Sequence, residues 1–396
     1  MMRYLTEKLC SETKFLNMII YILSNFFYIK IIFINTQRGG IMKRFFNFAF
    51  ALGILAFAII SCTGPEGPAG PPGKDGSPGT AVCGVCHESS SFLLAKQMQF
   101  HNSLHYLGEN FGIANRTQCA VCHTHEGFRE SLTTKLDTTL AVIPNPTGPN
   151  CRTCHYIHTK YDTTDYALTY TAPVKFRYGG QTVDFGEGNL CAKCHQARPV
   201  SPAPVVNGDS INVANFRWGP HYGANANIYA GVGGFEIPGP ETYPTSNPHK
   251  TRIKDGCITC HMAQPFGAFA GGHTFKMTYE SQGQEVEHVA SCATADCHPG
   301  TTKFDIDGKV TEIKNLIAQL RQKLIDKGLL DVSRNPDGTN VLNEYILLPG
   351  NKPKKFSSLE AGAVLNYLLV AKDRSNGIHN YKYTKALLVN TLNALQ

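Results

Sequence analysis

The final segment of the chain, residues 301–396, has the clearest helical pattern of apolar and polar positions. Four of its apolar residues recur at spacings of four, three and four, namely Ile313, Ile317, Leu320 and Leu324. This spacing predicts a helix with one apolar face, preceded by a turn at Asp307-Gly308. Ser357 and Glu360 have the spacing of a capping box and predict the start of a second helix. A third helix is expected over 383–395, so we expect a helical C-terminal region.

Residues 81–300 show few sustained helical or strand periodicities. Gly, Pro, Asn and Thr interrupt the apolar positions throughout this region, as is typical of long loops. The exception is 92–107, where helical spacing predicts one helix with His101 and His105 on the same face. The predicted fold class is therefore mostly α with extensive loops.

The first 61 residues are expected to be absent from the mature protein. Residues 1–41 fit neither a domain nor a signal, and Met42 is a better start, because two basic residues and the short apolar stretch 45–60 follow it. Residues 59–62, Ile-Ile-Ser-Cys, resemble a lipobox, so Cys62 is the expected lipidated N-terminus. The alternative is an uncleaved membrane anchor that ends near Ile60. Under both interpretations, the rest of the chain is exported.

Residues 62–80 are expected to form a linker of collagen-like composition. Five Gly-x-y triplets run from Gly64 to Pro78. Five are few for a triple helix, so we favour a stiff polyproline II spacer beside the lipid anchor, with a trimerising stalk as the alternative. Thr63 after Cys62 is compatible with an outer-membrane lipoprotein that faces the periplasm or the cell exterior.

Cysteine and histidine are frequent, with 14 and 15 residues, and they cluster in six motifs. Five motifs read Cys-x-x-Cys-His, and the sixth has four residues between its cysteines. Two thiols at this spacing reach the two vinyl groups of a haem, while the adjacent imidazole meets the iron from the same side. The sequence therefore predicts six covalently attached c-type haems. The expected attachment residues are Cys83, Cys86, Cys119, Cys122, Cys151, Cys154, Cys191, Cys194, Cys257, Cys260, Cys292 and Cys297.

Zinc, redox and disulfide interpretations fit these motifs less well. A zinc site needs four ligands and gives no reason for a histidine directly after every second cysteine. A redox dithiol normally occurs once in a chain, and disulfides between cysteines three residues apart are strained. The expected proximal iron ligands are the motif histidines His87, His123, His155, His195, His261 and His298.

Each iron also needs a second axial ligand. Methionine is disfavoured, because beyond the signal region only Met98, Met262 and Met277 remain, and Met262 adjoins a motif histidine. Nine histidines outside the motifs suffice for bis-histidine coordination throughout, which gives low-potential haems closed to small ligands. The favoured distal ligands, from their local settings, are His105, His158, His221, His249, His273 and His379. The alternatives are His101, His125 and His288.

The formal charge of +7 belongs to the full chain and does not describe the mature protein with its expected haems. Seven basic and two acidic residues lie within residues 1–61, which leaves 30 basic and 28 acidic residues beyond them. Six haems add about twelve propionates, so the loaded protein is expected to be net acidic. Neither a basic stripe nor a recognition motif is present, which excludes a nucleic-acid partner.

The motif contexts resemble the multihaem cytochrome c superfamily, which includes the pentahaem nitrite reductases, the hydroxylamine-oxidising cytochromes and related exported electron carriers. The resemblance covers roughly residues 81–396 and is carried by Cys260-His261-Met262, by Gly272-His273-Thr274-Phe275 and by 373–380. It implies a helical and loop scaffold around closely stacked haems, with a C-terminal helical region that returns a distal histidine. The nitrite reductases have lysine in place of one motif histidine, and none of the six motifs here does.

Electron transfer is the function that these features favour, with the chain relaying electrons to partner cytochromes or terminal acceptors in the cell envelope. The first alternative is an enzyme that reduces nitrite or another small oxyanion at one haem with an open position. The second is a subunit of a haem-lined conductive filament. Whether the chain is an enzyme stays open, with a carrier preferred. The expected partners are redox proteins of the envelope and, through the lipid anchor, the membrane; an oligomer is compatible with the sequence.

Overall fold

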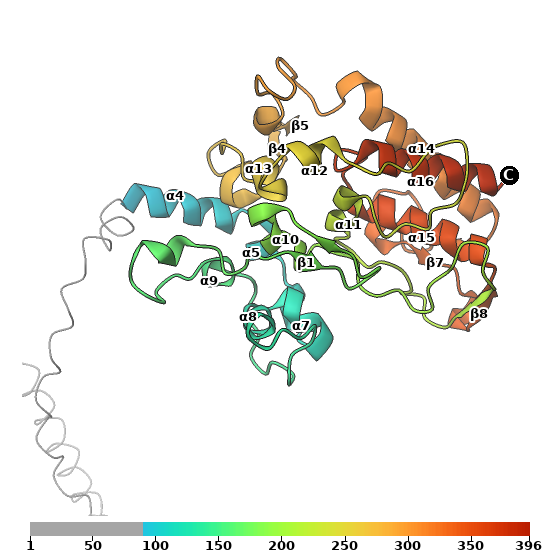
Figure 1. Cartoon of the computed structure of the whole chain (residues 1–396), viewed down its shortest axis with the longest axis horizontal. Coiled ribbons are helices and arrows are strands. Elements are labelled where there is room, and N and C mark those ends of the chain that lie inside the picture. Colours follow the sequence, from blue (N-terminus) through green and yellow to red (C-terminus); the bar gives the residue numbers. More distant parts are fainter. Residues whose placement is uncertain (1–89) are drawn as a thin grey trace, which may run out of the picture. The chain divides into compact units, whose positions relative to one another are not determined.

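Helices joined by long irregular segments make up most of the computed structural model, which describes residues 90–396 (Figure 1). The predicted signal region, the expected linker 62–80 with Cys62, and the first Cys-x-x-Cys-His motif with Cys83, Cys86 and His87 lie outside the described residues. Among residues 90–396, no helix combines the length and the apolar character needed to cross a membrane.

Between residues 90 and 300 the helices are short. They are α4 (Ser90–His101), α5 (Leu104–Leu107), α6 (Asn110–Ile113), α7 (Thr117–His123), α8 (His125–Thr134), α9 (Cys151–Cys154), α10 (Asn189–Ala192), α11 (Asn225–Ala230), α12 (Pro248–Arg252) and α13 (Gly256–His261). The same region contains four single 3₁₀ turns, η1 (Thr163–Tyr166), η2 (Gly186–Gly188), η3 (Gly272–Thr274) and η4 (Val289–Ser291). The prediction of extensive loops in this region is confirmed.

Within residues 90–396 the strands form four small antiparallel pairs. They are β1 (Val174–Lys175) with β2 (Thr182–Val183), β3 (Ile211–Val213) with β8 (Lys354–Phe356), β4 (Thr278–Ser281) with β5 (Gln284–Glu287), and β6 (Leu330–Asp331) with β7 (Tyr345–Ile346). The pairing of β3 with β8 places Ile211 opposite Phe356. It therefore ties the middle of the chain to the C-terminal region.

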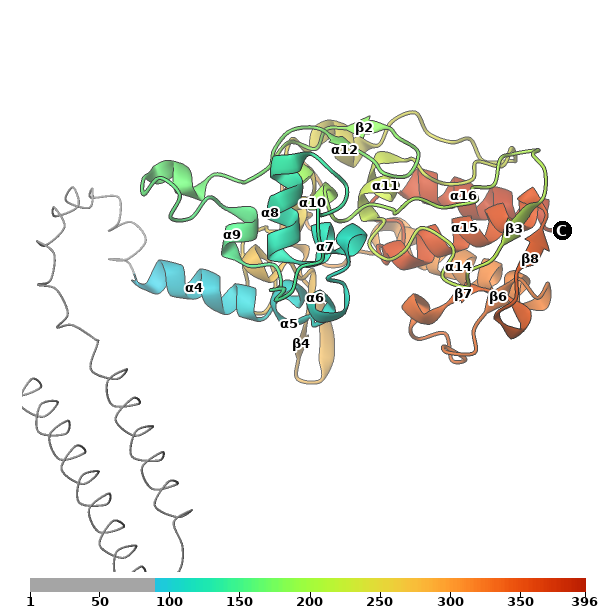
Figure 2. The same cartoon turned by 90° about the horizontal axis from the view of Figure 1, so that it is seen from below.

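Three longer helices, α14 (Lys309–Asp326), α15 (Ser358–Asp373) and α16 (Tyr381–Ala394), pack side by side near the C-terminus (Figures 1 and 2). All three were predicted, and the stripe on α14 buries Ile313, Leu320 and Leu324 completely. The capping box that starts α15 is present, because the Ser357 and Glu360 side chains each bond to the other residue's backbone N–H. Further 3₁₀ turns lie at η5 (Ile306–Gly308), η6 (Val341–Asn343) and η7 (Pro349–Asn351).

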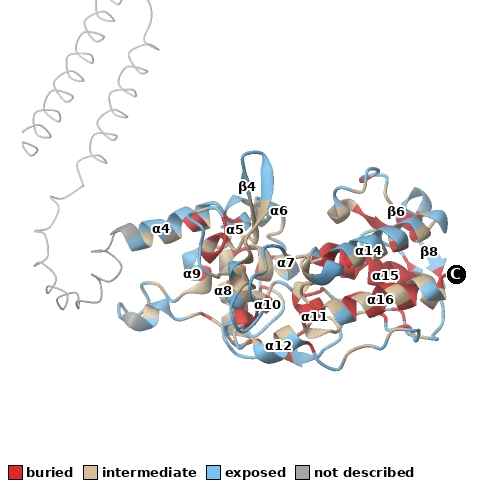
Figure 3. Ribbon diagram, turned by 90° about the horizontal axis from the view of Figure 1, so that it is seen from above, coloured by how far each residue is buried: buried red, intermediate tan, exposed pale blue. Residues whose placement is uncertain are grey.

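The main apolar core surrounds α15, which is buried along nearly its whole length (Figure 3). Residues from the middle of the chain, such as Trp218 and Phe235, share this core with α14, α15 and α16. A second, smaller cluster gathers around Phe176 and Phe185. For its length, the segment 90–300 contributes fewer buried apolar residues than the segment 301–396.

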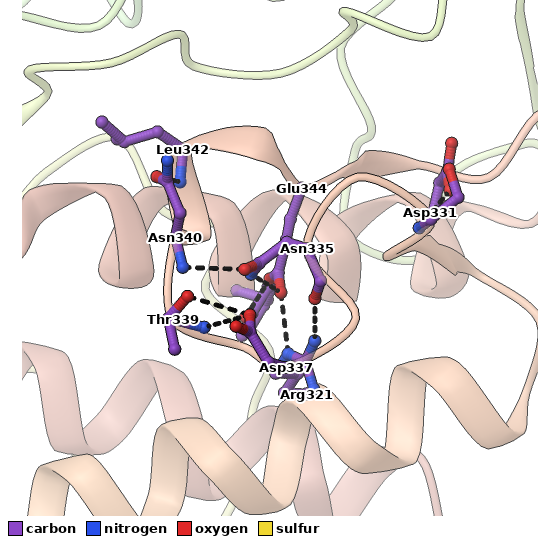
Figure 4. A network of polar contacts seen from close by, with 10 residues as sticks. Arg321, Asp331, Asn335, Asp337, Thr339, Asn340, Leu342 and Glu344 are labelled. Atoms are coloured by element: carbon purple, nitrogen blue, oxygen red, sulfur yellow. Dashed lines mark hydrogen bonds and ion pairs between the residues drawn. The ribbon is translucent and has the colours of Figure 1, made fainter.

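A buried carboxylate fixes the segment before β7 against α14 (Figure 4). Glu344 is fully buried, and its Oε1 accepts hydrogen bonds from Arg321 Nε at 2.7 Å and from Asn335 Nδ2 at 2.6 Å. Its Oε2 accepts a hydrogen bond from the Tyr367 hydroxyl of α15. These donors offset the cost of removing the carboxylate from water, which would otherwise be several kcal/mol.

The single helix predicted over 92–107 is wrong, because the chain leaves the helical path between α4 and α5. Ser103 is extended, with φ −82° and ψ 155°, and its hydroxyl caps α5 by accepting a hydrogen bond from the Tyr106 N–H. Serine competes well for such local bonds and thereby starts a new helix. His101 and His105 consequently belong to different helices rather than to one face.

Candidate functional site

Five of the six cysteine and histidine motifs lie within the described residues, and short helical turns carry most of them. The motif with His123 lies on α7, the one with His155 on α9 and the one with His261 on α13. On α9 the turn starts at Asn150, whose side chain forms a reciprocal capping box with Thr153. Such a turn keeps two thiols three residues apart on one side of the backbone.

The ten described motif cysteines form no disulfides and are free thiols. Among residues 90–396 no group of three or more His, Cys, Asp and Glu side chains is arranged to hold a metal ion. The thiols remain available for attachment to a prosthetic group.

Each of the five described motif histidines faces one histidine from outside the motifs. The ring centres are 5.9 Å apart for His195 and His105, 6.2 Å for His123 and His221, 6.3 Å for His155 and His273, 6.4 Å for His298 and His249, and 6.2 Å for His261 and His379. All five outside partners belong to the six distal ligands favoured from the sequence. The fold thus brings together residues that are far apart along the chain.

These separations fit two imidazoles bound to opposite sides of one iron. A bond of about 2.0 Å on each side, with about 1.1 Å from the nitrogen to the ring centre, places two ring centres about 6.2 Å apart. Ordinary aromatic contacts also fall between about 4.5 and 7 Å, so a single pair would be weak support. Ordinary aromatic contacts do not explain why nearly the same distance between ring centres recurs at every described motif.

The other described histidines do not face a described motif histidine. His101 stacks on Tyr106 with ring centres 4.2 Å apart. The Nδ1 of His125 is 2.9 Å from the Thr153 hydroxyl, and Nε2 of His288 is 2.8 Å from the Gln264 carbonyl oxygen. These three were the alternatives in the sequence.

His158 is the sixth favoured distal ligand. Its ring stacks on that of Tyr161, with ring centres 5.6 Å apart. The motif histidine without a described partner, His87, lies outside the described residues. His158 as its ligand therefore stays a prediction.

Hydrogen bonds to Nδ1 orient several of the paired rings. His155, His261 and His249 have the carbonyl oxygens of Tyr166, Phe275 and Ile378 at 2.7, 3.0 and 3.1 Å from Nδ1. A carbonyl can only accept, so Nδ1 carries the proton and Nε2 is left with a free lone pair. This tautomer is the one that presents Nε2 as a metal ligand.

Burial lowers the pKa of His105 and of His273 and so favours their neutral forms. Desolvation, followed by the charge of His195, lowers the pKa of His105 to about 4. Desolvation and then the charge of Lys96 lower the pKa of His273 to about 4. A neutral imidazole is the form that binds a metal, so both rings are competent ligands near pH 7.

His379 differs electrostatically from the other outside histidines. Burial favours its neutral form, but the charge of Asp373 and a hydrogen bond from Nδ1 to that carboxylate outweigh burial, so its pKa is raised. Sequence reasoning identified His379 and did not single out Asp373. An acidic residue six positions before a candidate ligand is not by itself a signal, because the turn that brings them together cannot be read from spacing.

Local backbone conformation places two of the outside histidines. His221 follows Gly219-Pro220 and has a φ of 70°, a left-handed conformation that costs energy for a residue with a side chain. His273 lies on the η3 turn directly after Gly271 and Gly272, which both have positive φ. A side chain at Gly272 would be strained by the positive φ and would displace the end of the Gln99 side chain on α4, so the position favours glycine.

Four of the five described motifs adjoin one another in space. Side-chain contacts join Cys122 with Cys194, Cys191 with Cys257, and Cys260 with Ser291 beside Cys292. The motif of His195 therefore lies between those of His123 and His261, and the motif of His298 follows. Four of the five described attachment sites therefore form a contiguous series rather than isolated sites.

No family model matches this chain, and no curated protein matches it. Among solved structures, it is similar to an undecaheme cytochrome from the S-layer of Carboxydothermus ferrireducens, with 18% sequence identity and a TM-score of 0.40. The match covers 74% of this chain, and the chain spans only 39% of that protein. A likeness at this level identifies neither a family nor a function, so the conclusions below rest on the chain's own residues.

Proposed function

We propose that this chain is an exported electron-transfer cytochrome that carries six c-type haems. The observation that carries the proposal is the set of five histidine pairs with ring centres 5.9 to 6.4 Å apart, one at each described motif. In each pair the motif histidine is the proximal ligand and the outside histidine is the distal one. For the sixth haem, we propose His87 and His158.

Bound haems supply one-electron redox chemistry, and the chain controls how they are held. The motif cysteines form the thioether links, and the two imidazoles of each pair occupy both axial positions. With both positions filled, small ligands are excluded and the coordination sphere changes little on reduction. The contacts between successive motifs support closely stacked haems in a continuous series.

The reductase alternative has its best support at the pair of His123 and His221. Burial and then the charge of Arg198 lower the pKa of His221 to about 4, and the Lys372 ammonium is buried 4.8 Å from the centre of the Tyr222 ring. Cations and a phenol beside an iron could bind an oxyanion. The histidine opposite His123 argues against an open position there, so electron transfer is preferred.

The cellular setting is part of the proposal. We place the protein at the outer membrane through lipidated Cys62, with residues 62–80 as the spacer, and expect redox proteins of the cell envelope as donor and acceptor. A haem-lined filament remains the second alternative. His101 and His125, which face no described motif histidine, are the residues that such an assembly could use between subunits.

An electron paramagnetic resonance spectrum of the oxidised holoprotein tests the proposed function, together with total haem measured as pyridine haemochrome. We expect six haems per chain, all low-spin, with no change on adding cyanide or nitrite. A high-spin fraction of about one haem in six that responds to either ligand would favour the reductase. Absence of covalently bound haem would refute both.

A further inference from the structure

A buried carboxylate touches only one of the five described histidine pairs. Nδ1 of His379 lies 2.7 Å from Oδ1 of Asp373, and only 2% of the Asp373 side chain is exposed. The Ser375 hydroxyl donates to the other carboxylate oxygen, and Asn225 Nδ2 donates to Oδ1 at 3.1 Å. Asp373 is therefore held in one orientation, aimed at the distal ring.

The same position in the other pairs is occupied by neutral groups. Nδ1 of His155 and of His249 is paired with a backbone carbonyl oxygen. Nδ1 of His273 is buried and has no hydrogen-bond partner among the described residues. His379 and His273 are thus the two extremes among distal ligands that are otherwise chemically identical.

Helix stability does not account for Asp373. It is the last residue of α15, where the partial negative charge of the helix dipole disfavours a carboxylate. Burial adds a desolvation cost. The favourable contacts that offset these costs all involve His379 and the residues that hold Asp373 beside it.

A carboxylate that accepts the Nδ1 proton makes the imidazole a stronger electron donor through Nε2. Its negative charge, in surroundings of low polarity, also stabilises the iron state with the greater positive charge. Both effects favour the oxidised iron. We propose that Asp373 is a positioning residue that gives the haem between His261 and His379 the lowest reduction potential of the five described pairs.

Asn225 connects this pair with its neighbour. Its Nδ2 donates to the backbone oxygen of Asp373 at 2.8 Å as well as to the carboxylate, and its Oδ1 is 3.4 Å from Nδ1 of His195. His195 is the motif histidine of the pair with His105. One amide therefore fixes the carboxylate and orients a ligand of the adjacent haem.

The test is a spectroscopically monitored redox titration of the holoprotein and of Asp373→Asn, which keeps the shape and a hydrogen-bond acceptor but removes the charge. We expect the most negative potential to shift positive, with the low-spin resonance signal of one haem changing and the others unmoved. Asp307→Asn is the matched control, because this exposed aspartate loses the same charge at a position where asparagine tolerates the positive φ.

Ser375→Ala gives an independent check with the opposite sign. It removes the hydroxyl that shares the carboxylate's charge, so the same potential should become more negative, which structural damage would not produce. An unchanged lowest potential in either variant, or an equal shift in Asp307→Asn, would overturn the proposal.

The inference rests on the proposed function, and the two can fail separately. If the chain binds no haem, no redox step is observed in any variant and the proposed function fails. If all variants have the haem content, the low-spin spectrum and also the reduction potentials of the wild type, the haem assignment stands and only the role of Asp373 fails.

Discussion

In the proposed holoprotein, replacing one distal histidine should open one haem and leave the others closed. His249 suits this test, because its partner His298 belongs to the motif at the end of the series. It lies on the short helix α12, and the two ring centres are 6.4 Å apart. His249→Ala removes the imidazole, and its only described hydrogen bond is with the Ile378 carbonyl oxygen at 3.1 Å. The structural cost outside the pair should therefore be about 1 kcal/mol.

The magnitude follows from the number of motifs. One iron of six becomes five-coordinate, so about a sixth of the total haem should turn high-spin. The reduced variant should bind one carbon monoxide per chain, while the wild type binds none. Carbon monoxide titration by absorbance, normalised to pyridine haemochrome, measures this directly.

His288→Ala is the matched control, since His288 is also half-buried and bonded to a carbonyl oxygen but faces no described motif histidine. It should bind no carbon monoxide. The reasoning fails if His249→Ala stays fully low-spin with an unchanged haem content, or if His288→Ala opens a haem instead.

Three further predictions concern stability. Glu344→Gln leaves the Arg321 guanidinium without its buried counter-ion. The free energy of unfolding, measured by urea titration, should therefore fall by about 3 kcal/mol. The exposed control is Asp326→Asn, and an equally small change in both variants would contradict this prediction. Ser357→Ala removes the N-cap of α15 and should lower the free energy of unfolding by about 1 kcal/mol in the same assay. The control Ser333→Ala should have no measurable effect. Equal effects of the two substitutions would refute the role of the cap. Protein made without haem attachment should keep protease resistance in α14 to α16 but be cleaved rapidly within residues 90–196, where the apolar core is sparse. Uniform resistance in limited proteolysis with mass spectrometry would show that haem is not needed for the fold.

The C-terminal helices could be predicted because their signals are local. The apolar stripe on α14 and the capping box of α15 each lie within a few turns of the chain, so the sequence contains all that decides them. The attachment motifs are equally local. The break between α4 and α5 was missed because the apolar spacing continues across it, while the deciding interaction is the capping bond from Ser103 to the Tyr106 N–H.

The partners of the histidines could not be predicted, because pairing depends on the path of long loops. His105 is nearest in sequence to the motifs of His87 and His123, yet it faces His195. Local settings such as Gly-Gly-His at His273 indicate that a histidine sits at a tight turn, which is a property of the backbone there. They carry no information on which distant segment the turn will meet.

The pairs also explain how a region with so little core can hold one conformation. Four of the five join segments roughly a hundred residues apart, and closing loops of that length costs conformational entropy that few buried apolar side chains in residues 90–196 can offset. In the proposed holoprotein, each iron with its two histidines and thioether links closes one such loop. The haems would then replace the missing core as well as carry electrons. On this argument, opening a distal position in the middle of the series should loosen the fold more than opening one at its end. This favours His249, the partner of His298, over His105 or His379 for a clean functional test.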